Sequence, residues 1–299
     1  MKSKKLLIVA AVALVIVLGT VGIASAITNG EPDAGRHPYV ALLVFGVETD
    51  DGFVPFWRCS GALIAPDVIL TAGHCTDGAT AARVWFDEGP VPWGTWDPGV
   101  NPTCNGETGY PCTGDAEGTT YTNPDFCHFC YHQGYGLPAF SYRDAGVIVL
   151  TKRVQKKVVG EYAQLPEAGV VDTLEDKTDI DLVGYGVQYQ DQIPGKELPP
   201  PPPPPRQRWT GPRQRLYAPS ELVSGEFVHA AEYMRLSMNP GGGTDGMCFG
   251  DSGGPDLLGG TDIVLAVNSY GSNFNCSGVG YSARVDIHEV LEWIEEFLH

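Results

Sequence analysis

Three short segments combine residue types that could carry out nucleophilic catalysis. They are Thr71-Ala72-Gly73-His74-Cys75, an aspartate at Asp144 before an apolar stretch, and Gly250-Asp251-Ser252-Gly253-Gly254-Pro255. In the last segment, glycines and a proline impose an unusual backbone around one serine and let amides approach a ligand closely. A serine hydroxyl is a weak nucleophile, so it needs a base, and the base needs a carboxylate to orient it. The sequence supplies one candidate for each role: Ser252, His74 and Asp144.

Short apolar stretches bounded by Gly, Pro or Asp must position these segments. They are rich in Val, Ile and Leu, which predicts strands. The predicted strands are 39–47, 61–64, 68–71, 146–150, 180–184 and 263–267. Only 286–298 has apolar residues at helical spacing, on an otherwise acidic segment. We therefore expect an all-β body with a C-terminal helix.

The histidine and serine segments, in this order and with an aspartate-led strand between them, resemble the trypsin/chymotrypsin-type (chymotrypsin-fold) serine proteases. The order His74, Asp144, Ser252 differs from the orders found in subtilisin and in α/β-hydrolases. The resemblance implies two six-stranded antiparallel β-barrels packed face to face and a C-terminal α-helix at 286–298. It covers one protease domain at 27–299, with the junction between the barrels near 155–180.

The resemblance also implies a mechanism for a serine-type endopeptidase. Ser252 attacks the peptide carbonyl to form an acyl-enzyme, His74 takes and returns the proton, and Asp144 holds the imidazole. The backbone amides of Gly250 and Ser252 form the oxyanion hole. Protein or peptide substrates are the expected partners, and we expect no cofactor and no metal.

Specificity is predicted from the family's pocket positions. Gly246 is expected at the floor, Gly271 at an open entrance, and Val279 in a narrowed interior. Ser269 belongs to the segment expected to pair with an extended substrate. An uncharged pocket predicts cleavage after apolar or aromatic residues. A shift of one residue would instead place Asp245 at the floor and favour Arg or Lys.

The N-terminus predicts secretion. Three lysines precede the apolar run 6–23, and Ala24-Ser25-Ala26 follows it, which is typical of a signal peptide at 1–26. An uncleaved membrane anchor is the alternative, and only then would the chain contact a membrane. The resemblance implies that a new amino terminus at Ile27 pairs with Asp251. Because Ile27 follows Ala26 directly, our hypothesis is that removal of the signal peptide itself activates the enzyme. The alternative is that cleavage falls elsewhere and Ile27 is only a strand residue.

The chain has eight cysteines, an even number that fits disulfides in an exported protein. The resemblance implies the pairs Cys59–Cys75 and Cys248–Cys276. Two local disulfides are expected in the loop-like region 88–142, with the pairing left open among Cys104, Cys112, Cys127 and Cys130. Zinc on Cys127 and Cys130 is the alternative, although a second such pair at the usual spacing is missing.

Composition limits the partners further. The net charge is −17 and no basic tract stands out, which argues against nucleic acid. The proline run from Pro199 to Pro205 predicts a polyproline II rod, either a spacer or a site for a proline-motif partner. We expect a monomer. An inactive binding module on the same fold and a serine esterase are the competing functions.

Overall fold

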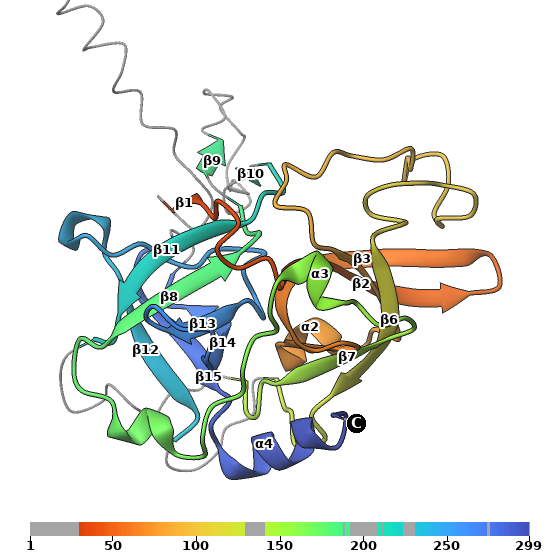
Figure 1. Cartoon of the computed structure of the whole chain (residues 1–299). Helices are drawn as coiled ribbons and strands as arrows, with labels where there is room; N and C mark the ends of the chain where they lie inside the picture. The colour runs from red at the N-terminus through yellow and green to blue at the C-terminus, as the bar shows by residue number, and fades with distance from the viewer. Residues whose placement is uncertain are drawn as a thin grey trace, which may run out of the picture.

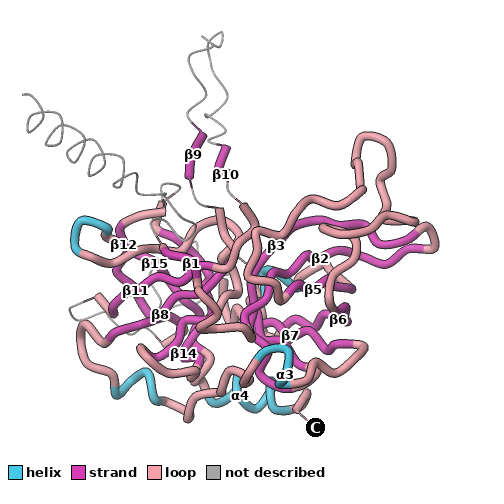
Figure 2. The backbone as a smooth tube through the Cα atoms, turned by 45° about the horizontal axis from the view of Figure 1, so that its top comes forward, coloured by secondary structure: helices cyan, strands magenta, loops and turns pink. Residues whose placement is uncertain are grey.

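The computed structural model describes residues 30–128, 141–187, 189–191, 208–210, 212–223, 231–273 and 276–298. In Figures 1 and 2, two bodies of strands lie side by side, and a short C-terminal helix runs beneath them. The signal segment, Ile27, Cys130 and the run from Pro199 to Pro205 fall outside the described residues. No helix among the described residues is long and apolar enough to cross a membrane.

The first body is a closed antiparallel barrel in the order β2-β3-β4-β7-β6-β5. Its strands are β2 (Val40–Thr49), β3 (Gly52–Ala65), β4 (Val68–Thr71), β5 (Ala81–Trp85), β6 (Ala116–Thr122) and β7 (Gly146–Leu150). Apolar side chains of β2, β4 and β7 are almost completely buried in its core. The short helix α2 (Gly73–Thr76) follows β4 directly.

The second body is a seven-stranded antiparallel sheet in the order β1-β11-β8-β13-β14-β15-β12. Its strands are β1 (Glu31–Pro32), β8 (Asp179–Gly184), β11 (Leu216–Glu221), β12 (Tyr233–Met238), β13 (Pro255–Leu258), β14 (Val264–Gly271) and β15 (Gly278–Arg284). The sheet curls until Leu222, just after β11, forms an isolated bridge with Leu236 of β12. A separate ribbon pairs β9 (Tyr189–Asp191) with β10 (Arg208–Thr210).

The predicted fold class is confirmed, with a difference in the second body. Two six-stranded barrels were predicted, but only the first body is a closed barrel; the second is an open, curled sheet. It has seven strands in place of six, because the short strand β1 adds to the edge of β11. The expected strands are present, and several are longer than predicted. The sequence pattern missed β5, β6, β11, β12, β13 and β15, whose apolar residues are fewer or interrupted by polar ones.

The connection between the two bodies contains helix α3 (Lys156–Val159) and the 3₁₀ turn η1 (Val170–Thr173). A second 3₁₀ turn, η2 (Pro240–Gly242), follows β12. The helix α4 (His288–Glu295) buries Val290, Leu291 and Ile294. Beyond α4, the ring of Phe297 lies 5.0 Å from that of Tyr121 in β6, so the end of the chain returns to the first barrel.

Candidate active site

Pairing between β4 and β7 brings the histidine and aspartate segments together. Thr71 at the end of β4 pairs with Gly146 at the start of β7. His74 and Asp144 therefore lie just beyond the same edge of the barrel. The His74 backbone N–H donates to Asp144 Oδ1 at 2.7 Å, and His74 Nδ1 lies 2.9 Å from Asp144 Oδ2. Two contacts to one carboxylate fix the orientation of the imidazole ring.

Asp144 is buried but well satisfied. The hydroxyl of Ser269 in β14 donates to its Oδ2, so the second body contributes to this cluster. Burial acts to raise the pKa of Asp144, but the charge and hydrogen bonds of His74 outweigh it, and the pKa falls below its ordinary value. Burial acts to lower the pKa of His74, and Asp144 outweighs it, so the pKa is raised. The pair therefore favours an imidazolium beside a carboxylate.

Ser252 lies between the two bodies. Its carbonyl accepts the Ser60 N–H of β3 at 2.8 Å, and the next amide, from Gly253, donates to Asn268 O of β14 at 2.7 Å. Cys75 Sγ lies 3.7 Å from both the Ser252 carbonyl oxygen and His74 Nε2, so serine and histidine flank the same sulfur. Within the described part of the chain, the Ser252 hydroxyl has no hydrogen-bond partner.

The loop that carries Ser252 leaves backbone donors open. The amides of Asp251 and Gly253 each donate to a carbonyl, but those of Gly250 and Ser252 donate to nothing among the described residues. Gly250 has a φ of +98°, which an L-residue rarely adopts. At Gly253, a Cβ would stand 2.1 Å from Thr71 Oγ1. Glycine at these two positions allows a backbone conformation in which two N–H groups beside the serine stay free, as an oxyanion hole requires.

Asp251 points away from Ser252 into a buried site. Its Oδ1 accepts the Gly186 N–H at 2.7 Å and its Oδ2 accepts the Cys248 N–H at 2.9 Å. A Cβ at Gly186 would lie 2.2 Å from the carboxylate, so only glycine fits there. Burial raises the pKa of Asp251 to about 7, although the two N–H donors and the positive charge of Arg58 act to lower it.

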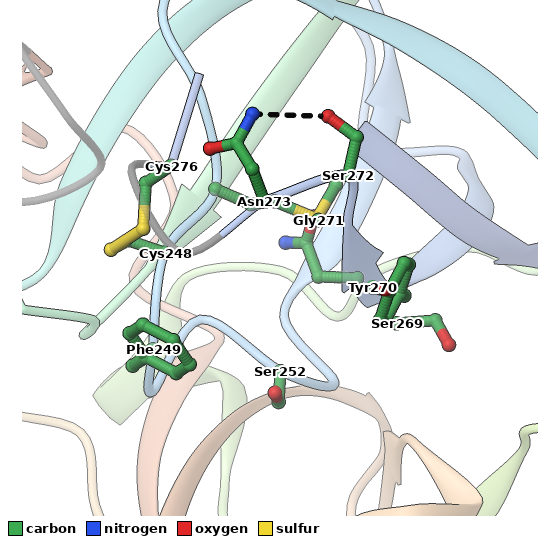
Figure 3. A pocket seen from close by; sticks show the side chains of 11 residues that line it. Cys248, Phe249, Ser252, Ser269, Tyr270, Gly271, Ser272, Asn273 and Cys276 are labelled. Carbon is green, nitrogen blue, oxygen red and sulfur yellow. Dashed lines mark hydrogen bonds between the residues drawn. A yellow bond between two sulfur atoms is a disulfide. The ribbon is translucent and has the colours of Figure 1, made fainter. Parts of the chain in front are cut away.

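A cavity of about 390 Å³ opens beside Ser252 (Figure 3). It lies between the disulfide side, with Phe249, and the β14 side, with Ser269 and Tyr270. Its remaining lining residues are Met247, Cys248, Asn268, Gly271, Ser272, Asn273 and Cys276. None of these lining residues is ionisable at neutral pH. Met247 and Asn268 were not expected from the sequence, which gave no signal for them beyond their proximity to Cys248 and Ser269.

Two predicted pocket residues lie elsewhere. Gly246 does not line the cavity, because Met238 covers it: a Cβ there would stand 2.6 Å from Met238 Cβ. Val279 does not line it either, contrary to the prediction. The register pairs Gly271 with Gly280, so Gly280 faces the entrance glycine and Val279 points to the other face of β15. Asp245 also lies outside the lining.

The structure joins Cys59 to Cys75, Cys104 to Cys112 and Cys248 to Cys276. Cys127 is also disulfide-bonded, which leaves it no thiolate for a zinc ion. Within the described residues, the one grouping with metal-ligand side chains is Cys59, His74 and Cys75. Because its two sulfurs form a disulfide, this grouping does not offer a metal site.

Comparison with known proteins places this arrangement in context. The family model described as Trypsin matches residues 27–92. The chain is 25% identical to human chymotrypsin-like elastase family member 3A over 277 residues, covering 91% of this chain and 88% of that protein. It is 24% identical to bovine proproteinase E, covering 91% of this chain and 94% of that protein.

A comparison with solved structures concerns the fold. The HL collagenase crystal structure superposes with a TM-score of 0.58 at 19% identity, covering 90% of this chain and 96% of that one. At this identity the likeness shows the fold alone.

Proposed function

We propose that the chain is a secreted endopeptidase of the trypsin/chymotrypsin type, with His74, Asp144 and Ser252 as its triad. The Trypsin family model at 27–92 and the similarity to elastase-like proteins support the proposal. The observation that carries the proposal is the His74–Asp144 ion pair beside a serine whose loop leaves two N–H groups unbonded. The proposed domain is 27–299, with the barrels joined near 155–180. It acts as a monomer on protein or peptide substrates.

In the proposed mechanism, Ser252 attacks the substrate carbonyl as His74 accepts the hydroxyl proton. The raised pKa of His74 suits this role, since the imidazolium forms beside the Asp144 carboxylate. The amides of Gly250 and Ser252 receive the oxyanion. His74 then donates its proton to the leaving amine, and water releases the acyl group by the same steps in reverse order.

The proposed primary pocket is uncharged, and it takes apolar or aromatic side chains. Support comes from its lining, in which Met247 and the Cys248–Cys276 disulfide supply apolar surface. Gly271 lines the cavity, and a Cβ there would have no atom closer than 3.6 Å, so this side of the pocket is open. Asp245, the alternative source of a negative floor, lies outside the cavity.

The proposed activation step is removal of residues 1–26. The new α-ammonium of Ile27 would pair with Asp251. Its carboxylate is buried beside Gly186 and forms no salt bridge among the described residues, although the charge of Arg58 acts on it. Such a pair would offset the desolvation of the carboxylate and hold the serine loop in place. The polyproline run from Pro199 to Pro205 is proposed as an exposed spacer that could also bind a proline-motif partner.

The test is fluorophosphonate labelling of the 27–299 protein. We expect stoichiometric labelling of the wild type and none of Ser252→Ala, because only an activated serine reacts. His74→Ala should also abolish labelling. A control variant, Asp50→Asn in an exposed turn, should label like the wild type. A folded 27–299 protein that does not label would overturn the proposed activity in favour of a binding module.

A further inference from the structure

Arg58 in β3 lies beside the reaction site. Its Nε is 3.2 Å from the point where a Cβ of Gly250 would stand, and Gly250 offers one of the two open amides. The two residues that follow Arg58 in the chain also contact the site. Cys59 forms a disulfide with Cys75, and the Ser60 N–H donates to the Ser252 carbonyl. The guanidinium thus packs against the proposed oxyanion hole.

Arg58 is on the side of Ser252 that faces the leaving group. The serine loop bonds to β3 through Ser60 and to β14 through Asn268, so the two strands flank it. The proposed substrate strand pairs with β14 and places its acyl portion over the pocket. Residues that follow the scissile bond must then continue past Ser252 toward β3 and Arg58.

No carboxylate of the described residues pairs with Arg58, although the chain has 36 acidic residues and only 19 basic ones. Other arginines do find partners. These pairs include Arg36–Glu31, Arg83–Glu48, Arg153–Asp67, Arg215–Asp33 and Arg284–Asp286. The charge of Arg58 acts on the buried carboxyl of Asp251, but the two groups form no salt bridge. Its guanidinium, without a salt bridge beside the reacting centre, is available for a substrate.

A second guanidinium adds to the positive potential. Arg213 donates from Nε to the Val91 carbonyl at 2.8 Å, and its guanidinium carbon lies 4.5 Å from the centre of the Tyr110 ring. The pKa of Arg213 is lowered chiefly by burial; Tyr110 acts to raise it, and the positive charge of Arg58 acts to lower it. The two guanidinium groups therefore repel each other, and an anion bound near both would relieve the repulsion.

We propose that Arg58, supported by Arg213, binds a substrate carboxylate one or two residues after the scissile bond. This inference rests on the proposed endopeptidase function and deepens it by naming a substrate class: chains with an acidic group on the leaving side. The planar guanidinium suits a carboxylate, since its N–H donors match the two oxygens. The carboxylate can be an Asp or Glu side chain or a free chain end.

The test compares peptides that share one acyl portion. One carries Glu as the second residue after the scissile bond and an amidated end, one carries Gln there, and one ends in a free carboxylate at that position. We expect kcat/KM for the Glu peptide to exceed that for the Gln peptide by about tenfold, as for a charge-assisted hydrogen bond. The preference should shrink as salt is raised.

Substitutions of individual arginines test which residue causes the preference for the Glu peptide over the Gln peptide. Arg58→Met keeps the length of the side chain and should bring the Glu/Gln ratio close to one, while Arg58→Lys should retain part of it. Arg213→Met should reduce the ratio less. The control, Arg153→Gln, removes an exposed arginine that pairs with Asp67, and it should leave the ratio unchanged.

The outcomes separate this inference from the proposed function. Binding of the same peptides to Ser252→Ala, measured by fluorescence polarisation, requires no catalysis and should show the same dependence on Arg58. A preference for the free chain end alone, lost in Arg58→Met, would identify the terminal carboxylate as the ligand. A Glu/Gln ratio near one in the wild type, or an unchanged ratio in Arg58→Met, would overturn the inference.

Discussion

The closed barrel and the seven-stranded sheet bury acidic side chains in different ways. At the edge of the first barrel, Asp144 contacts His74 and Ser269, and its pKa falls below the ordinary value. In the second body, Asp251 and Asp256 are completely buried, and both pKa values are raised because desolvation is the largest effect. Burial is common to all three carboxyls, and the partner decides which form is stable.

Asp256 is the more extreme of the two second-body acids. Its register partners are Ala266 and Leu182, whose side chains belong to the apolar interior. Ser282 lies close enough to favour the ionised form, but neither carboxyl oxygen has a hydrogen bond of normal geometry within the described chain. Burial in this setting favours the protonated carboxyl and raises its pKa.

The three buried carboxyls differ in the partners that surround them. Asp144 contacts His74, so it can stabilise the imidazolium that forms during the proposed reaction. Asp251 has two backbone donors, and its proposed cationic partner is the ammonium of Ile27. Asp256 has neither kind of partner, and burial favours its neutral form. Each assignment can be tested by removing the charge or the partner.

Asp144→Asn should have the largest effect. The amide keeps the shape of the carboxylate but cannot stabilise an imidazolium or hold the correct tautomer, so kcat should fall by about 10⁴-fold. Peptide hydrolysis by the 27–299 protein measures this, with Asp50→Asn as the matched control. An Asp144→Asn enzyme within tenfold of the wild type would show that Asp144 is not the orienting acid.

A single extra residue before Ile27 should have the next largest effect. The displaced ammonium could not reach Asp251, and an unpaired buried charge costs about 3 kcal/mol or more, so active-site titration should find at least a hundredfold less activity. The matched comparison is the protein that begins at Ile27 itself. Equal activity for both forms would exclude the proposed activation pair.

Asp256→Asn should have the smallest effect, on stability alone. Because the folded pKa of Asp256 is raised, its contribution to stability is fully present below the unfolded pKa, near 4, and is lost as pH rises through the folded value. The variant does not titrate, so relative to the wild type it should gain about 1–3 kcal/mol between acidic and alkaline pH. Urea unfolding at several pH values measures this gain. The exposed Asp50→Asn should show no such trend, and a constant difference between wild type and Asp256→Asn would contradict the assignment.

The sequence predicted features that depend on neighbours along the chain. The glycines around Ser252 and the strand before His74 are local patterns, because backbone freedom and side-chain alternation are set over a few residues. The resemblance then supplied the fold class and singled out Asp144 among many aspartates. The strands β2, β4 and β7, whose apolar residues are nearly continuous, were predictable for the same local reason.

Only the tertiary structure decided features that depend on register and burial. One position along β15 separates Val279 from Gly280, and a shift of one residue reverses the face to which a side chain points. The missing partners of Asp256 and Arg58, and the contact of Ser269 with Asp144, arise between strands far apart in the sequence. The sequence by itself determined which residues could react, and folding decided which charges are paired, because desolvation and pairing depend on neighbours in space.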